Sequence, residues 1–261
     1  MTTATPDDPE HKDALEAHIQ QEFVEEARDV LNELDVAVGN VRSHTIRPEA
    51  ALGQFRRSCH NLLAGARAVN LGAVALLMHR LEDYVIDLRD LNTAQLDDIQ
   101  AFLDKLRGAL DGEVAIADLS AVVRQLPARK TFDIGDIVLL DIEVLLVNPQ
   151  RTAARFVERE LQACGYRVVN ARSSFEAIAL AVRGKPDMII CSAVLDELTG
   201  VDLACAFSAM PATERIPFAL LTSFEWGHAS LERLPSRCAI LRVGTHFGDD
   251  LAEALSRFNI T

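Results

Sequence analysis

The chain has 261 residues, a formal net charge of −13 and 49% hydrophobic residues, enough apolar material for two domains of ordinary size. Residues 1–142 hold 25 acidic and 14 basic side chains, whereas residues 143–261 hold 14 and 12. An acidic surface repels a phosphate backbone, so nucleic acid is not an expected partner. No run approaches the roughly 18 apolar residues that a membrane span needs, so no membrane association is expected.

The cysteines and the N-terminus indicate a compartment. The five cysteines are an odd number with no CxxC spacing and no clustered histidines, so neither a disulfide framework nor a metal site is indicated. The opening MTTATPDDPEHKD lacks the basic and apolar parts of a signal peptide. We therefore expect a cytoplasmic protein.

In residues 1–126, apolar residues recur at spacings of three and four, as in amphipathic helices. The helices are expected over His11–Arg42, Pro48–Val69, Ala73–Leu91 and from a cap at Thr93 to Gly112, with a fifth possible at Ala117–Leu126. Four such helices with short connections predict an antiparallel four-helix bundle.

Residues 127–142 are predicted to be a linker, whose apolar run DIVLLDI has no clear secondary structure. In residues 143–261 the period changes: the runs VLLVN, YRVVNA, DMIIC, FALLTS and CAILRV alternate with helical stretches. A capping box at Ser173 and Glu176 opens one helix, the segment after FALLTS is weakly helical, and the last helix covers about 249–258. This alternation predicts a doubly wound, five-stranded parallel sheet with helices on both faces.

His60 is the residue in the first half with the clearest chemical potential. On a helix turning about 100° per residue, it lies beside a buried stripe, on the same side as Arg56, Arg57 and Arg67. An exposed imidazole that is neutral near pH 7, with cationic donors nearby, suits phosphoryl transfer. The alternative is that His60 is a surface histidine without function among solvated arginines.

The stretch FRRSCHNLLAGARAVNLGAVALLMHRLED resembles the histidine-containing phosphotransfer (HPt) domain, whose signature is H-x-(L/I)-K-G-(G/S)-A followed later by H-x-(L/I)-E. The matching residues are His60, Leu62, Gly65, Ala66, His79, Leu81 and Glu82. The resemblance covers about residues 15–112 and implies that His60 is the phosphoacceptor.

Two positions depart from the signature: Leu63 replaces the lysine and Ala64 replaces the first glycine. Arg56, Arg57 or Arg67 is expected to replace the lysine as a phosphoryl-stabilising donor. His79 is expected to be a packed structural residue.

The second half resembles the receiver domain of response regulators, most clearly in PDMIICSAVLDELTGVDL. That chemistry needs three carboxylates, two for Mg²⁺ and one that accepts phosphate. The corresponding positions are Asn148, Pro149 and Ser192, with Thr222 at the hydroxyl position after the fourth strand. None of the first three is ionisable, so we expect a degenerate pseudo-receiver without a metal site.

Other side chains do not restore the missing chemistry. Asp196 and Glu197 lie too far beyond the third strand to act as acceptor, and Arg242 is the cation nearest the position of the usual lysine. The resemblance implies that the segment 227–258, which corresponds to the partner-binding surface of receivers, serves protein recognition.

The predicted function is a two-component or chemotaxis-type phosphorelay protein. The chain has no nucleotide-binding motif, so no cofactor and no kinase activity of its own are expected, and phosphate must come from a receiver domain or a histidine kinase. A homodimer stays open. The main alternative is a non-catalytic adaptor in which both modules are inactive; a hydrolase lacks its motifs.

Overall fold

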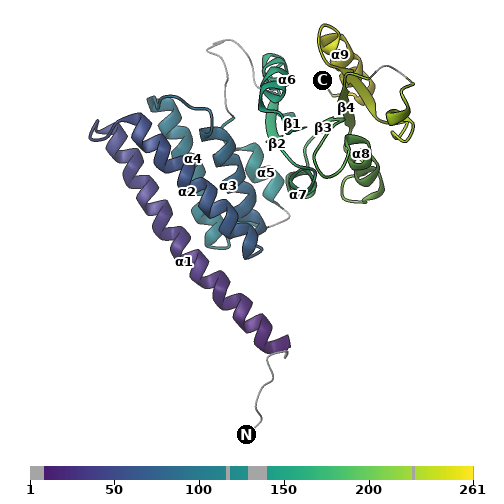
Figure 1. Ribbon diagram of the computed structural model, residues 1–261. Helices are drawn as coiled ribbons and strands as arrows, with labels where there is room; N and C mark the ends of the chain where they lie inside the picture. The colour runs from purple at the N-terminus through teal and green to yellow at the C-terminus, as the bar shows by residue number, and fades with distance from the viewer. Residues whose placement is uncertain (1–8, 116–117, 129–139, 225–226, 261) are drawn as a thin grey trace. The chain divides into compact units, whose positions relative to one another are not determined.

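The chain divides into two compact units, Met1–Pro127 and Ala128–Thr261 (Figure 1). The computed structural model describes residues 9–115, 118–128, 140–224 and 227–260. Residues 129–139, most of the predicted linker, lie outside the described residues, so the linker and the domain boundaries drawn around it stay predictions.

The first unit is helical. Its helices are α1 (Pro9–Arg42), α2 (Pro48–Ala68), α3 (Gly72–Val85), α4 (Thr93–Leu110) and the short α5 (Leu119–Arg124). Consecutive helices from α1 to α4 pack on one another, α1 also packs on α4, and α5 lies against α3. These contacts close the predicted four-helix bundle, and α1 continues well past the shorter helices (Figure 1).

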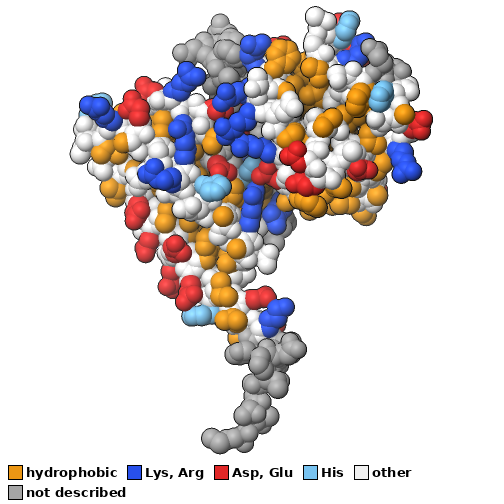
Figure 2. All heavy atoms as spheres, in the orientation of Figure 1, with side chains coloured by type: hydrophobic (Ala, Val, Ile, Leu, Met, Phe, Trp, Pro, Cys, Tyr) orange, Lys and Arg blue, Asp and Glu red, His pale blue; other side chains and the backbone are white. Residues whose placement is uncertain are grey.

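The bundle is held by a continuous apolar core and by pairs between its helices. Phe55, Leu77 and Phe102 are among the large side chains that are almost completely buried. The Tyr84 hydroxyl donates to Asp98 Oδ2 over 2.6 Å, which joins α3 to α4. Acidic side chains line the exposed side of α1 (Figure 2), in keeping with the charge of this half.

One predicted cap is wrong by a residue. Asn92, rather than Thr93, caps α4: its side chain accepts from Gln95 N at 2.9 Å, while Gln95 Oε1 accepts from Asn92 N at 2.8 Å. Asparagine fits this role because its amide oxygen reaches the free N–H groups of the first turn.

The second unit is a parallel sheet between helices. The strands are β1 (Glu143–Val147), β2 (Arg167–Ala171), β3 (Met188–Ser192), β4 (Phe218–Thr222) and β5 (Ala239–Arg242). The helices are α6 (Arg151–Ala163), α7 (Ser174–Gly184), α8 (Gly200–Ala209) and α9 (Phe247–Phe258). All strands are parallel in the order β2-β1-β3-β4-β5, which is the predicted doubly wound, flavodoxin-like topology.

Both faces of the sheet are covered, as the continuously apolar strands require. On one face, side chains of α6 and α9 such as Leu161 and Phe247 join a buried cluster with the strands; α7 and α8 cover the other face (Figure 1). The capping box predicted at the start of α7 is only half formed: Ser173 Oγ accepts from Glu176 N at 3.2 Å, but Glu176 Oε2 accepts from Arg172 N, one residue before the cap, at 2.8 Å.

The predicted helical segment between β4 and β5 is wrong in extent. Only a single 3-10 turn, Ala229–Leu231, forms among its described residues. Gly227, with φ of 85°, and Pro235 interrupt the segment, which leaves too few consecutive residues for a stable helix. The edge of the sheet at β5 therefore has a loop beside it where the sequence predicts a weakly helical segment.

Candidate functional site

His60 lies in the middle of α2 and its side chain is 75% exposed. Its neighbours Phe55 and Cys59 are completely buried, so the helix is fixed to the bundle by one side and presents the imidazole on the other. The Nδ1 atom of His60 lies 3.2 Å from Oε1 of Glu82 in α3. Glu82 itself is only 23% exposed, because α3 packs closely against α2.

This contact determines which nitrogen can react. A carboxylate accepts hydrogen bonds, so the stable arrangement places a proton on Nδ1, where it is donated to Glu82. The other nitrogen, Nε2, then carries a lone pair and faces solvent. An imidazole held in one tautomer, with its nucleophilic nitrogen exposed, has the arrangement that attack on a phosphoryl group requires.

Two other residues of α2, Cys59 and Gly65, contribute to the site without reacting themselves. Burial raises the pKa of the Cys59 thiol, and the charge of Glu82 raises it further, so this cysteine stays protonated and does not compete as a nucleophile. Gly65 lets α1 approach α2 closely: a Cβ at this position would lie 2.5 Å from the ring of Phe23. The motif glycine therefore has a packing reason here.

The structure separates the three arginines that the sequence placed near His60. Arg56 donates from Nε to the carbonyl oxygen of Val85 at 3.2 Å and from Nη2 to that of Leu88. Its guanidinium binds the end of α3, which stops at Val85 rather than at the predicted Leu91. Arg56 is therefore engaged away from His60, contrary to the expectation from the helical wheel.

Arg57 and Arg67 are both exposed. Arg57 lies one turn before His60, and within the described part of the chain no hydrogen bond or ion pair engages its guanidinium. Arg67 lies two turns after the histidine, about 10 Å along the helix axis. Of the three, Arg57 is the exposed arginine one turn from His60; its Nη1 lies beside Gly53, so a change of rotamer is needed to bring the guanidinium to a group on His60.

The two departures from the HPt signature have different surroundings. Leu63 is 4% exposed, so the lysine position of the family is occupied here by a core side chain. Ala64 is exposed and small, and leaves the helix surface beside the imidazole open. His79, the other histidine of the signature, is 7% exposed, as expected for a structural residue.

In the second unit, the receiver-like positions meet at the carboxyl end of the sheet. Strand register places Asn148, just after β1, level with Ser192 at the end of β3, and Thr222 ends β4 next to it. Asn148 and Thr222 are buried. Asn148 Oδ1 accepts from Gln150 N at 2.9 Å, and Thr222 Oγ1 accepts from Phe224 N at 3.0 Å, so each side chain bonds its own loop.

Two charged residues near this edge, Arg242 and Glu197, have partners away from the receiver-like positions. Arg242 donates to Asp250 in α9 from Nη2 at 2.6 Å, from Nε at 2.9 Å and from its backbone N at 2.8 Å. These bonds hold the pKa of Asp250 below its usual value. Glu197 accepts from Ser174 Oγ at 3.0 Å, whereas Asp196 is exposed on the loop.

Pro149 follows Asn148 and has no side-chain oxygen to offer a metal. Among the described residues, no group of three His, Cys, Asp or Glu side chains is arranged to hold a metal ion. Gly200 is required for packing, because a Cβ there would lie 2.3 Å from the carbonyl oxygen of Ser192. This part of the receiver-like motif therefore maintains the fold independently of the chemistry.

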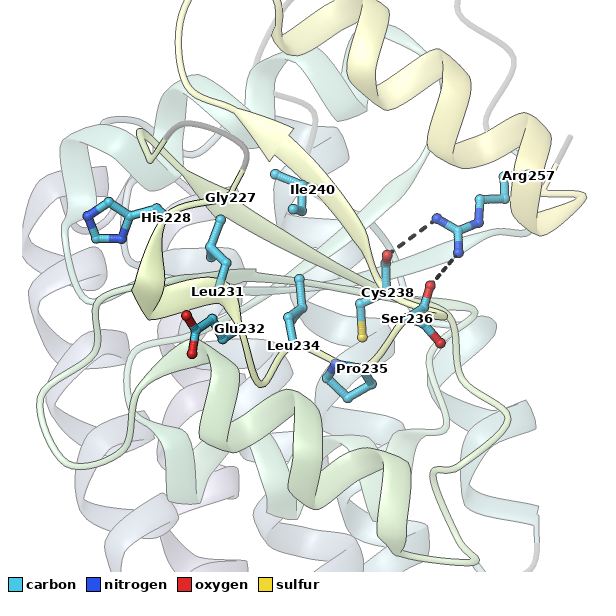
Figure 3. Close-up of a pocket in the computed structure, with 10 residues that line it drawn as sticks. All are labelled: Gly227, His228, Leu231, Glu232, Leu234, Pro235, Ser236, Cys238, Ile240 and Arg257. Carbon is cyan, nitrogen blue, oxygen red and sulfur yellow. Dashed lines mark hydrogen bonds between the residues drawn. The ribbon is translucent and has the colours of Figure 1, made fainter.

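A cavity of about 280 Å³ lies beside β5, within the segment that the sequence assigns to recognition (Figure 3). Its apolar wall includes Leu231, Leu234 and Ile240. Arg257 of α9 points across one end, donating to the carbonyl oxygens of Ser236 at 2.8 Å and Cys238 at 3.3 Å (Figure 3). The 3-10 turn between β4 and β5 contributes Leu231 to this wall.

Comparison with known proteins identifies the first unit. Residues 18–116 match the family model described as the Hpt domain. A search of curated protein sequences found no match. No helix among the described residues is long and apolar enough to cross a membrane.

The second unit is similar to solved receiver structures. A putative response regulator from Chloroflexus aurantiacus J-10-fl is 23% identical, covers 45% of this chain and 98% of its own, and has a TM-score of 0.41. The chemotaxis response regulator CheY4 of Vibrio cholerae is 23% identical over the same shares, with a TM-score of 0.40. The receiver domain of a sensor histidine kinase from Pseudomonas aeruginosa PAO1, solved with a magnesium ion in its active-site cleft, is 20% identical, with shares of 45% and 98% and a TM-score of 0.41.

Residues 18–116 are an Hpt domain, and the second unit has the flavodoxin-like fold that receivers share, with parallel strands in the order β2-β1-β3-β4-β5. The Hpt domain indicates a protein of two-component phosphorelay. Glu82 matches the last position of the HPt signature, but the sequence alone does not indicate its role. Its contact with His60 was missed because the pairing of α2 with α3, which brings residues 60 and 82 together, is a tertiary feature.

Proposed function

We propose that the chain carries a phosphoryl group on His60 and exchanges it with a phospho-aspartate on a separate receiver domain or with a histidine kinase. The observation that supports this most is the pairing of an exposed His60 with Glu82 through Nδ1 at 3.2 Å. It leaves Nε2 as the nucleophile, on a helix that is fixed to a rigid bundle.

In the transfer step, the lone pair of Nε2 forms a bond to phosphorus while the bond from phosphorus to the aspartyl oxygen of the donor breaks. The electron pair of that bond leaves with the donor carboxylate. The imidazole then carries positive charge, which the hydrogen bond from Nδ1 to Glu82 stabilises. Arg57 supplies a cation one turn away for the phosphoryl oxygens.

The receiver-like unit is proposed to lack phosphorylation and to serve protein recognition. Asn148, Pro149 and Ser192 provide no carboxylate for Mg²⁺ or for an acyl phosphate, and Arg242 is bonded to Asp250. The cavity beside β5, with its apolar wall, supports a recognition role for this side of the unit.

The test is transfer from a radiolabelled, phosphorylated receiver to the full chain. We expect label that is lost in acid and stable in base, as phosphohistidine is, and no label on His60→Gln. Equal labelling of His60→Gln would exclude His60 as the acceptor.

A non-catalytic adaptor is the second candidate, because Leu63 is buried where the family has a lysine and Arg56 is bonded to α3. The adaptor hypothesis predicts no label on the unchanged chain or on His60→Gln, while both still bind the partner receiver. Binding of the partner receiver should therefore be measured on the same samples.

A further inference from the structure

Helix α7 of the receiver-like unit is apolar on two opposite sides. One side, with Ala177, Leu180 and Ala181, is buried against the sheet. The opposite side faces solvent and carries Phe175, which is 63% exposed, and Val182, which is 38% exposed. A surface helix normally turns polar side chains to solvent, so an apolar side that faces solvent indicates a surface that another element covers.

The solvent-facing side forms a regular stripe, defined here as the exposed Phe175 and Val182 and, between them, the partly buried Ile178 and Ala179. Their spacing of three, four and seven residues places them along one line of the helix. Hydrophobic side chains are also gathered at the surface over α7 and its neighbour α8 (Figure 2). The stripe therefore belongs to a wider apolar surface.

We propose that a second copy of this chain covers the stripe, with the two α7 helices antiparallel across a two-fold axis near Ala179. Ala179 is the middle residue of Ser174–Gly184, and its small side chain lets two helices approach closely where they cross. A two-fold arrangement then places Phe175 of each copy beside Val182 of the other.

The charges beside the stripe agree with self-association. Glu176 and Arg183 lie on the same flank of α7, two turns apart. The two-fold axis brings Glu176 of each copy level with Arg183 of the other, so two opposite-charge pairs form. Arg183 is exposed and within the described residues makes no hydrogen bond or ion pair, so its guanidinium is available for this contact. An isologous contact of this kind closes after two copies and gives a dimer.

The test uses the full chain and measures mass against concentration by analytical ultracentrifugation. We expect a reversible dimer, and the double variant Phe175→Ser, Val182→Ser should raise its dissociation constant at least about tenfold, since each change acts twice. Val243→Ser, which alters a side chain 56% exposed elsewhere in the same unit, is the control and should change nothing.

Cysteine crosslinking locates the axis. In a background with Cys164 and Cys205 changed to serine, Ala179→Cys should give a disulfide-linked dimer under mild oxidation. Ala252→Cys, an exposed alanine on α9 across the sheet, should not. A chain that stays monomeric at all concentrations, or that dimerises without preferential crosslinking at residue 179, overturns the proposal; phosphotransfer to His60 is unaffected by either result.

Discussion

The two units differ in how they treat the place where phosphate chemistry would occur. In the Hpt unit, His60 is exposed and its partner among the described residues, Glu82, leaves Nε2 accessible. In the receiver-like unit, Asn148 and Thr222 are buried and bonded to their own loops, and Arg242 is bonded to Asp250. A reactive group needs a partner that orients it and an open side. His60 has both, whereas Asn148 and Thr222 have partners but are buried.

The largest effect is expected from breaking the orientation of His60. Glu82→Ala removes the acceptor of the Nδ1 proton, and groups that orient an imidazole in this way are typically worth about 10- to 100-fold in activity. The transfer rate from a phosphorylated receiver, measured by rapid quench, should fall by this amount. Glu82→Gln keeps an acceptor oxygen and should lose less; equal rates in all three proteins would show that Glu82 has no role in orientation.

The packing that supports the site can be broken at Gly65. A Cβ here meets the Phe23 ring at 2.5 Å, so Gly65→Ala should destabilise the Hpt unit by about 1–3 kcal/mol. Gly53 is the matched control, since a Cβ there meets only the end of the Arg57 side chain at 3.4 Å, and Gly53→Ala should stabilise by about 0.5–1 kcal/mol. Chemical denaturation, monitored by amide exchange in α2, measures the change in the free energy of unfolding for both variants. The critical result is that the two changes have opposite signs.

The ion pair of the receiver-like unit predicts a smaller, pH-dependent effect. Arg242 donates to Asp250 and lowers its pKa, so the stabilisation is fully present above the unfolded pKa of about 4 and is lost as the pH falls through the lower folded value. Asp250→Asn should cost about 1–2 kcal/mol at pH 7. The difference between the two proteins should shrink below about pH 4, as followed by amide exchange in β5. A constant difference from pH 7 to 2 would contradict this assignment.

The smallest effect is expected from adding a phosphate analogue to the receiver-like unit, because Asn148, Pro149 and Ser192 provide no carboxylate. Beryllofluoride with Mg²⁺ should leave the NMR spectrum of the receiver-like unit, recorded in the full chain, unchanged. Specific shifts around Ser192 would mean that the unit retains a phosphate-like binding site and would remove the contrast between the two halves.

Much of this architecture follows from local sequence. The bundle is predictable because a helix buried on one face repeats its apolar residues about every 3.6 positions. The parallel sheet is predictable because strands buried on both faces are continuous apolar runs. The Ser173 cap of α7 was also predictable, because the hydrogen bond from Glu176 N to Ser173 Oγ joins residues only three apart. Leu62 and Ala66 lie on the predicted buried stripe of α2.

The failures at the site involve contacts that are distant in sequence. A helical wheel places Arg56 beside His60, but the carbonyl oxygens of Val85 and Leu88 hold its guanidinium, and only the packing of α2 on α3 reveals this. The same packing supplies Glu82. Between β4 and β5, weak helical periodicity was outweighed by Gly227 and Pro235, so that a 3-10 turn formed.

The measurement that tests the central claim most directly is phosphosite mapping of the full chain by mass spectrometry, at neutral or basic pH, after incubation with a phosphorylated receiver. The account predicts one phosphoryl group per chain, on His60, and none in residues 143–261. Phosphate on Ser192 or on any other residue of the receiver-like unit, or a chain that gains no phosphate from any donor receiver or kinase, would contradict it.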